Sequence, residues 1–72
     1  MSYPQRAPEP QPSDMIQLLD FEGEVSDTWS RVRVILSHDR HEEVWEVLDS
    51  LGQVRLITAG AQPGAWLEVE PW

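Results

Sequence analysis

A 72-residue chain without cysteine must hold its fold together by packing alone. A disulfide framework and a thiolate metal site are both excluded, and a chain this short buries one small core. It has room for one binding surface, whereas a deep substrate cleft usually forms between larger layers or domains. Size therefore favours a binding module over an enzyme, and we expect no catalytic residues, no bound metal and no cofactor.

Acidic residues dominate the charge of the chain. Thirteen Asp and Glu face five arginines and no lysine, so the net charge is -8. Such a surface repels nucleic-acid phosphate and anionic lipid, and it speeds encounter with basic protein surfaces. The same charge also serves to keep a small protein soluble. The expected partner is a larger protein with a basic surface, with no direct contact to nucleic acid or membrane, and we expect a monomer.

The beginning of the chain differs in composition from the rest. Residues 1–13 contain four of the six prolines and few apolar side chains, which predicts a disordered Pro-rich tail. Residues 14–72 are then the single folded domain. Neither a secretory signal nor a membrane span is recognisable, so we expect a cytoplasmic protein.

Alternating apolar and polar residues predict strands. In residues 31–36, RVRVIL, the alternation predicts a strand with Val32, Val34 and Leu36 in the core. Pro63 and Gly64 suit the centre of a type II turn. The other predicted strands are residues 15–25, 54–58 and 65–72, with residues 23–29 connecting the first strand to the second.

A helix is predicted between the second and third strands, over residues 40–51. Asp39 with Glu42 forms a capping-box pattern at its start, and Gly52 suits its end. One apolar face follows helical spacing, formed by Val44, Val47, Leu48 and Leu51. The predicted fold is therefore α+β: a small, mostly antiparallel sheet of three to four strands with one packed helix.

Two surfaces of this predicted fold are candidates for partner binding. The polar face of the helix is acidic, with few cationic residues to pair with it. In the last strand, AWLEVEPW, two tryptophans share one parity with two glutamates, and we expect this parity to face outward. The predicted partner-binding residues are Glu42, Glu43, Glu46, Asp49, Trp66, Glu68, Glu70 and Trp72.

Catalytic residue types gather only in residues 37–43, SHDRHEE. His38 and His41 would bind zinc in an alternative interpretation, but their spacing matches no specific metal motif. A helix cap at Asp39 with solvated histidines explains the segment better. We therefore expect a non-enzymatic protein.

In its size, acidity, lysine-free composition and lack of catalytic motifs, the chain resembles the small acidic proteins that phages encode to redirect host machinery. These include inhibitors of bacterial RNA polymerase and anti-CRISPR proteins. The resemblance implies inhibition of host transcription through RNA polymerase binding in the host cytoplasm. The alternative is an antitoxin-like or adaptor protein that self-associates through its C-terminal strand.

Overall fold

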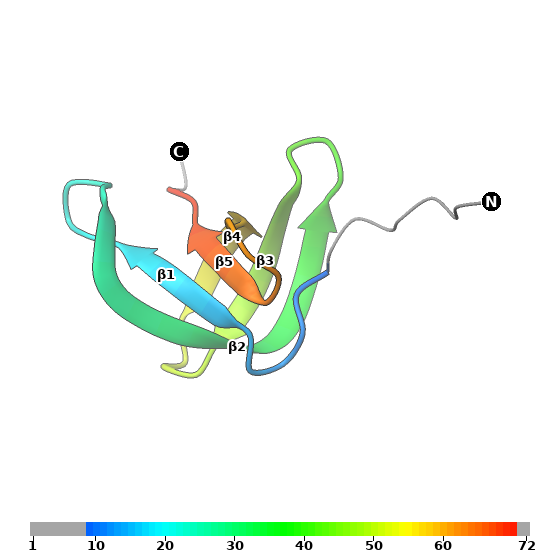
Figure 1. The fold of residues 1–72 in the computed structure, drawn as a ribbon. Helices are drawn as coiled ribbons and strands as arrows, with labels where there is room; N and C mark the ends of the chain where they lie inside the picture. The colour runs from blue at the N-terminus through cyan, green and yellow to red at the C-terminus, as the bar shows by residue number, and fades with distance from the viewer. Residues whose placement is uncertain (1–8, 71–72) are drawn as a thin grey trace.

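The computed structural model describes residues 9–70, which form a closed five-stranded barrel (Figure 1). Its strands are β1 (Met15–Leu19), β2 (Val25–Asp39), β3 (Val44–Asp49), β4 (Val54–Ala59) and β5 (Ala65–Glu68). Strands that follow each other in the chain pair antiparallel, and β5 closes the barrel by pairing parallel with β1. A meander with an odd number of strands meets its first strand in the parallel sense. The predicted α+β fold with one packed helix is therefore wrong, because the described part of the chain is all β.

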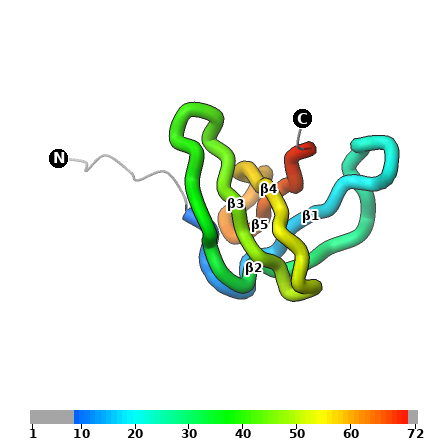
Figure 2. The backbone as a smooth tube through the Cα atoms, turned by 180° about the vertical axis from the view of Figure 1, so that it is seen from behind, coloured from blue at the N-terminus to red at the C-terminus, as the bar shows by residue number. Residues whose placement is uncertain are grey.

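The long strand β2 takes part in two ladders. Its first half pairs with β1 up to Arg31, and its second half pairs with β3 from Val32 onward. Figure 2 shows the barrel from behind, with β3 beside the second half of β2 and β4 on the other side of β3. The segment predicted as a connection, residues 23–29, thus contributes five residues to β2, from Val25 to Trp29.

Two irregularities in the β2–β3 ladder change which side chains of β2 point inward. The register slips between Val32 and Val34 and again between Ile35 and Ser37. An extra residue at a bulge reverses the inward and outward alternation that follows it. Val32 is consequently 2% exposed and Val34 is 45% exposed. The prediction that Val34 and Leu36 lie in the core is wrong for this reason.

The core lies inside the barrel and receives side chains from every strand. Its buried members are Ile16, Leu18, Val32, Trp45, Val47, Ile57 and Trp66, with Ile35 packed against them. The Trp66 indole Nε1 donates a hydrogen bond of 3.0 Å to the Asp14 carboxylate, which satisfies its only polar atom. The predicted outward position of Trp66 is therefore wrong: the even-numbered parity of the last strand faces the interior.

Residues 40–51 form a turn and a strand instead of the predicted helix. Asp39 Oδ1 accepts hydrogen bonds from the amides of His41 (2.9 Å) and Glu42 (3.2 Å), as a helix N-cap would. The chain then turns back because Glu43 adopts a left-handed conformation, with φ of 56°. In the strand β3 that follows, alternate residues point inward, so Leu48 is only partly buried and the predicted apolar face of a helix does not form.

Two other hairpins use the same turn chemistry, with glycine at the left-handed position. Asp20 Oδ1 accepts the amides two and four residues later, and Asp49 Oδ1 does the same. Gly23 and Gly52 have φ of 81° and 79°, which glycine adopts without steric cost. Gly52 therefore ends a hairpin turn, whereas the sequence had suggested a helix end.

Two predicted features at the ends of the domain can be compared with the structure. The turn at Pro63 and Gly64 is confirmed by the positive φ of Gly64 and by the hydrogen bond from Ala65 N to Gln62 O, 3.2 Å. Of the predicted tail, residues 1–13, the first eight lie outside the described residues. Among the remaining five, Pro10 is fully buried. Across residues 9–70 there is no helix with the length and apolarity needed to cross a membrane.

A comparison of Val32→Ala with Val34→Ala tests whether the bulge in β2 reverses the inward and outward alternation of its side chains. We expect Val32→Ala to lower the free energy of unfolding by about 2 kcal/mol, because it leaves a cavity in the core. Val34→Ala should cost less than about 0.5 kcal/mol, because Val34 is largely exposed. Urea unfolding followed by tryptophan fluorescence measures both, and equal costs would contradict the reversed alternation.

The left-handed residue Glu43 makes Glu43→Gly a stabilising substitution. We expect a gain of about 1 kcal/mol in the free energy of unfolding, because glycine removes the backbone strain at φ of 56°. Gly52→Ala is the converse control and should lose about 1 kcal/mol. Beyond its own residue and its two chain neighbours, a Cβ at residue 52 would meet no heavy atom within 4 Å, so this loss would report backbone strain alone. Thermal unfolding of both variants checks the two signs.

Candidate functional site

One chain of polar contacts links all five strands at one end of the barrel. The Asp49 carboxylate, fully buried on β3, accepts hydrogen bonds from Ser30 Oγ (3.1 Å) and Arg55 Nε (2.8 Å). Arg55 on β4 also contacts Glu68 on β5 through Nη1, at 3.0 Å. Glu68 in turn accepts the amide of Leu19 on β1, at 2.8 Å. We call these five residues the ionic network.

The ionic network keeps its carboxylate charged. Burial by itself raises the pKa of Asp49, but hydrogen bonds from Arg55, Gln53 and Ser30, together with the Arg55 charge, outweigh it. The pKa of Asp49 therefore lies below its ordinary value of 3.8. Burial likewise lowers the pKa of Arg55, and its bonds to Asp49 and Glu68 more than restore it. Asp49 and Glu68 both form ion pairs with Arg55, so neither is a free surface carboxylate.

A groove of about 440 Å³ lies on the outer side of the barrel, next to the second half of β2. Its apolar lining comes from Val44 on β3, Leu56 on β4 and Val69, which follows β5. Val69 is held beside Leu56 by a hydrogen bond of 2.7 Å from its amide to the Leu56 carbonyl. Glu46 stands opposite Leu56 in the β3–β4 ladder, so polar and apolar groups meet at the groove. We call this depression the acidic groove.

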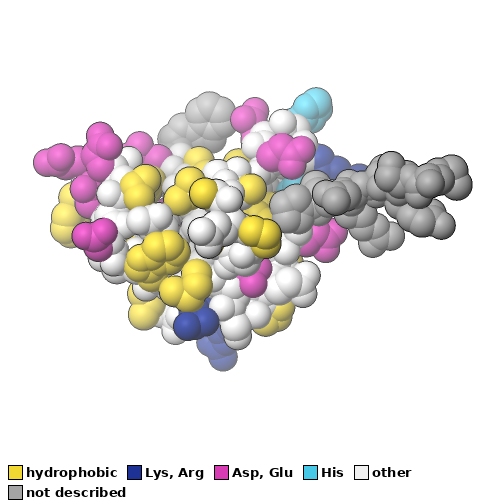
Figure 3. Space-filling model, viewed as in Figure 1, with side chains coloured by type: hydrophobic (Ala, Val, Ile, Leu, Met, Phe, Trp, Pro, Cys, Tyr) yellow, Lys and Arg dark blue, Asp and Glu magenta, His cyan; other side chains and the backbone are white. Residues whose placement is uncertain are grey.

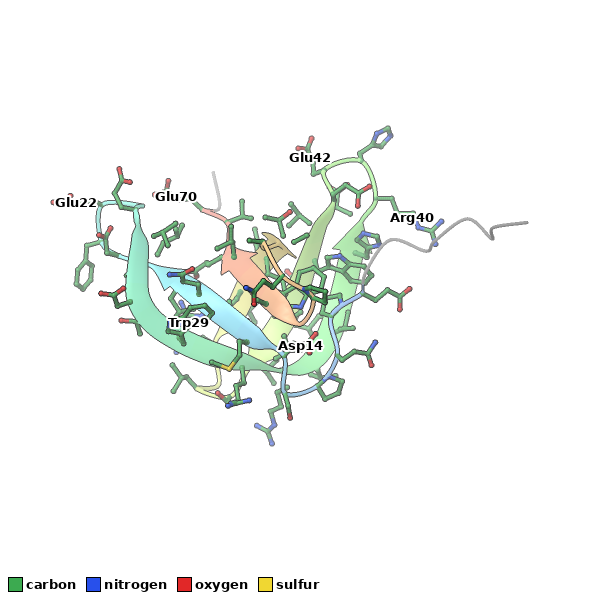
Figure 4. The ribbon with its side chains drawn as sticks, viewed as in Figure 1. Asp14, Glu22, Trp29, Arg40, Glu42 and Glu70 are labelled. Atoms are coloured by element: carbon green, nitrogen blue, oxygen red, sulfur yellow. The ribbon has the colours of Figure 1, made fainter. Side chains whose placement is uncertain are left out.

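Four carboxylates surround the apolar lining of the acidic groove, from Asp39, Glu42, Glu46 and Glu70. Figure 4 shows Glu42 and Glu70 on segments far apart in sequence, and the Glu70 carboxylate lies beside Gly23 of the β1–β2 turn. Ser37 Oγ lies 3.4 Å from Glu46 Oε1. Within residues 9–70, the ion pairs are those of Arg55, so these four carboxylates have no cationic partner there. The groove combines an apolar surface with uncompensated negative charge.

The structure brings together three of the eight predicted partner-binding residues. Glu42, Glu46 and Glu70 line the acidic groove, although they were predicted on two separate surfaces. Glu43 is exposed in the turn beside it and does not line it. Of the remaining predicted residues, two belong to the ionic network, one to the core and one lies outside the described residues: Asp49, Glu68, Trp66 and Trp72 respectively.

The two histidines lie in different surroundings. The His38 ring stacks on Trp45, with ring centroids 3.5 Å apart and nearly parallel planes, whereas His41 is exposed in the turn. His38 Nε2 is buried and has no hydrogen-bond partner among residues 9–70. In the same part of the chain, no three His, Asp or Glu side chains are grouped to hold a metal ion. Nothing in this arrangement favours the alternative zinc interpretation.

Comparison with known proteins gives no match among protein-family models, curated proteins or solved structures. The resemblance in class to phage proteins therefore stays a prediction. The geometry of the acidic groove and the charge of the chain are the features that bear on function.

The buried charge pair makes stability depend on Asp49. We expect Asp49→Asn to lower the free energy of unfolding by about 3 kcal/mol at pH 7, because Arg55 loses its closest anionic partner. A depressed pKa in the folded state stabilises above the unfolded value of 3.8 and loses this effect as the pH falls through the folded pKa. The difference between wild type and variant should therefore shrink as the pH drops below 3.8. Urea unfolding across pH 7 to about pH 3 measures it.

Asp20→Asn is the matched control for this variant. Asp20 makes the same two turn hydrogen bonds as Asp49, but it is exposed and outside the ionic network. Asparagine keeps the accepting oxygen, so the cost should stay within about 0.5 kcal/mol. Equal costs at the two positions would place the effect of Asp49 in its turn and not in the charge pair.

Proposed function

We propose that the chain is a non-enzymatic binding domain whose acidic groove takes up a cationic side chain from the basic surface of a larger protein. The observation that carries the proposal is the combination of an apolar lining with four carboxylates that have no cationic partner among the described residues. An apolar lining alone would suit many ligands. The carboxylates restrict the choice to groups that carry positive charge.

Arginine and lysine side chains have the two parts that such a groove can bind, an aliphatic stem and a positively charged head. Their aliphatic stems pack on apolar surface while the charged head reaches a polar rim. Val44, Leu56 and Val69 offer that apolar surface, and the nearby carboxylates accept the charge-assisted hydrogen bonds that guanidinium donates. The volume of about 440 Å³ lies within the range of about 300 to 1,000 Å³ of ligand pockets.

Long-range charge supports the same kind of partner. A net charge of -8 on a small domain attracts basic surfaces before contact and raises the association rate at low salt. Enzymes that process nucleic acid carry basic channels, and bacterial RNA polymerase is the partner that the resemblance to phage proteins implies. We therefore propose inhibition of such an enzyme, in the cytoplasm, by occupation of a surface that phosphate otherwise contacts.

The alternative, self-association through the C-terminal strand, has less support. That idea needs an exposed strand edge. β5 pairs with β1 on one side and with β4 on the other, so its backbone groups are engaged on both sides. We carry this alternative no further.

Neutralising groove carboxylates should weaken binding of a basic peptide. The probe is a peptide of four Arg-Pro repeats, which carries positive charge but is a poor strand former. We expect its addition to shift the methyl NMR signals of Val44, Leu56 and Val69 at low salt. The double variant Glu46→Gln/Glu70→Gln should raise the dissociation constant about tenfold, because two partners of the cationic head are lost.

The charge-matched control is Glu9→Gln/Glu43→Gln, which removes two exposed carboxylates that do not line the groove. Its dissociation constant should change less than about twofold, since only the long-range attraction is reduced. Equal weakening in both double variants would mean that the net negative charge, and not the groove, causes binding, and it would overturn the proposal. Direct binding to purified RNA polymerase, lost in the groove variant and kept in the control, would support RNA polymerase as the partner.

A further inference from the structure

The first half of β2 has a partner strand on one side only. Val25, Trp29 and Ser30 pair with residues of β1, with a register shift between Val25 and Trp29, while the β3 ladder begins at Val32. The last backbone hydrogen bond on the β3 side runs from Ser50 N to Arg31 O, at 2.9 Å. Figure 1 shows this part of β2 as an arc at the outer border of the molecule, with β1 on its inner side. Within residues 9–70, no strand pairs with its other edge.

Hydrogen bonds at the two ends of this arc establish which backbone groups face the open edge. The Arg31 carbonyl points to the β3 side, and backbone groups alternate sides along a strand, so Trp29 presents its N–H and C=O to that side too. At the other end, the Glu24 carbonyl accepts the Asp20 amide on the β1 side, at 2.7 Å. Val25, next along the chain, therefore faces the open edge as well.

The side chains along this edge are exposed, apolar and surrounded by acid. Val25 and Trp29 are 56% and 44% exposed, and Phe21 at the preceding turn is fully exposed. Figure 3 shows acidic side chains gathered over the β1–β2 turn, where the described acidic residues are Asp20, Glu22 and Glu24. Asp27 lies between Val25 and Trp29 on β2 and is also exposed. Figure 4 places Trp29 on the arc itself.

We propose that this edge of β2 binds an extended, basic segment of a partner protein as an added strand. Backbone pairing at Val25 and Trp29 supplies the directional contacts, and the exposed apolar side chains pack on apolar residues of the added strand. The surrounding carboxylates select lysine or arginine at the alternate positions. This surface shares no residue with the acidic groove, so it does not depend on the proposed function.

A second copy of the chain is a poorer occupant. Two identical β2 edges paired antiparallel about Asp27 would oppose the two Asp27 carboxylates and bring two molecules of charge -8 together. A basic segment meets the same edge with opposite charge. Charge complementarity therefore favours a different, basic protein over a second copy of this chain.

The test uses a peptide of four Lys-Val repeats, which favours an extended strand with lysines on one face. We expect it to slow amide hydrogen exchange at Val25 and Trp29, because these amides become donors to the added strand. Val25→Lys should weaken binding about tenfold, because it removes an apolar contact and places like charge at the edge. Native-state exchange followed by NMR and a fluorescence anisotropy titration measure these effects.

Val54→Lys is the matched control, because Val54 is 58% exposed and lies on β4, which is not part of the open edge of β2. It makes the same change in residue and charge, and we expect less than a twofold loss of affinity. The same peptide with N-methyl groups at every residue should bind at least about tenfold more weakly, since it has no amide hydrogen to donate to the edge. Equal binding of the methylated peptide, or protection confined to residues of the acidic groove, would overturn the edge proposal. Neither result would affect the Arg-Pro experiment.

Discussion

The Asp49 carboxylate is the group on which the barrel most depends. It is fully buried, it caps the β3–β4 turn through the amides of Leu51 and Gln53, and it begins the line of contacts through Arg55 and Glu68. A buried charge is tolerated only when it is paired and fully hydrogen-bonded, so these bonds must form together. Strand order and the position of the hairpin are thereby tied to one side chain. The price is that these acidic residues are unavailable to a partner.

Strand alternation was predictable where no irregularity intervened. The strand at residues 54–58 and the Pro63–Gly64 turn follow from local residue preferences, and the structure has both. The helix prediction failed because an aspartate that accepts nearby amides and a glycine with positive φ occur both at helix ends and in hairpin turns. Two such residues at the right separation resembled a capped helix. The repeated pattern of Asp followed by Gly three residues later, at Asp20 and Asp49, is the signal that distinguishes the hairpins.

Side-chain direction was less predictable than strand position. Val32 and Val34 are equivalent by period, yet a bulge whose cause lies in the ladder with β3 separates them. Trp66 points inward because Asp14, far away in the sequence, accepts its indole hydrogen. The acidic groove joins residues from three strands and the segment after β5, so only its carboxylates were recognisable beforehand. Apolar groups such as Leu56 and Val69 become part of a site only when the barrel closes around them.

The parallel seam between β1 and β5 also bears on how the protein comes into being. It consists of three residue pairs, the first joining Met15 to Ala65, so the contact that completes the barrel is among the most distant in the chain. The hairpins between neighbouring strands need only local contacts and form early. During synthesis, a nascent chain can therefore hold preformed hairpins, but the core stays open to water until Glu68 has left the ribosome. Completion of the native state is then set by closure of one long loop.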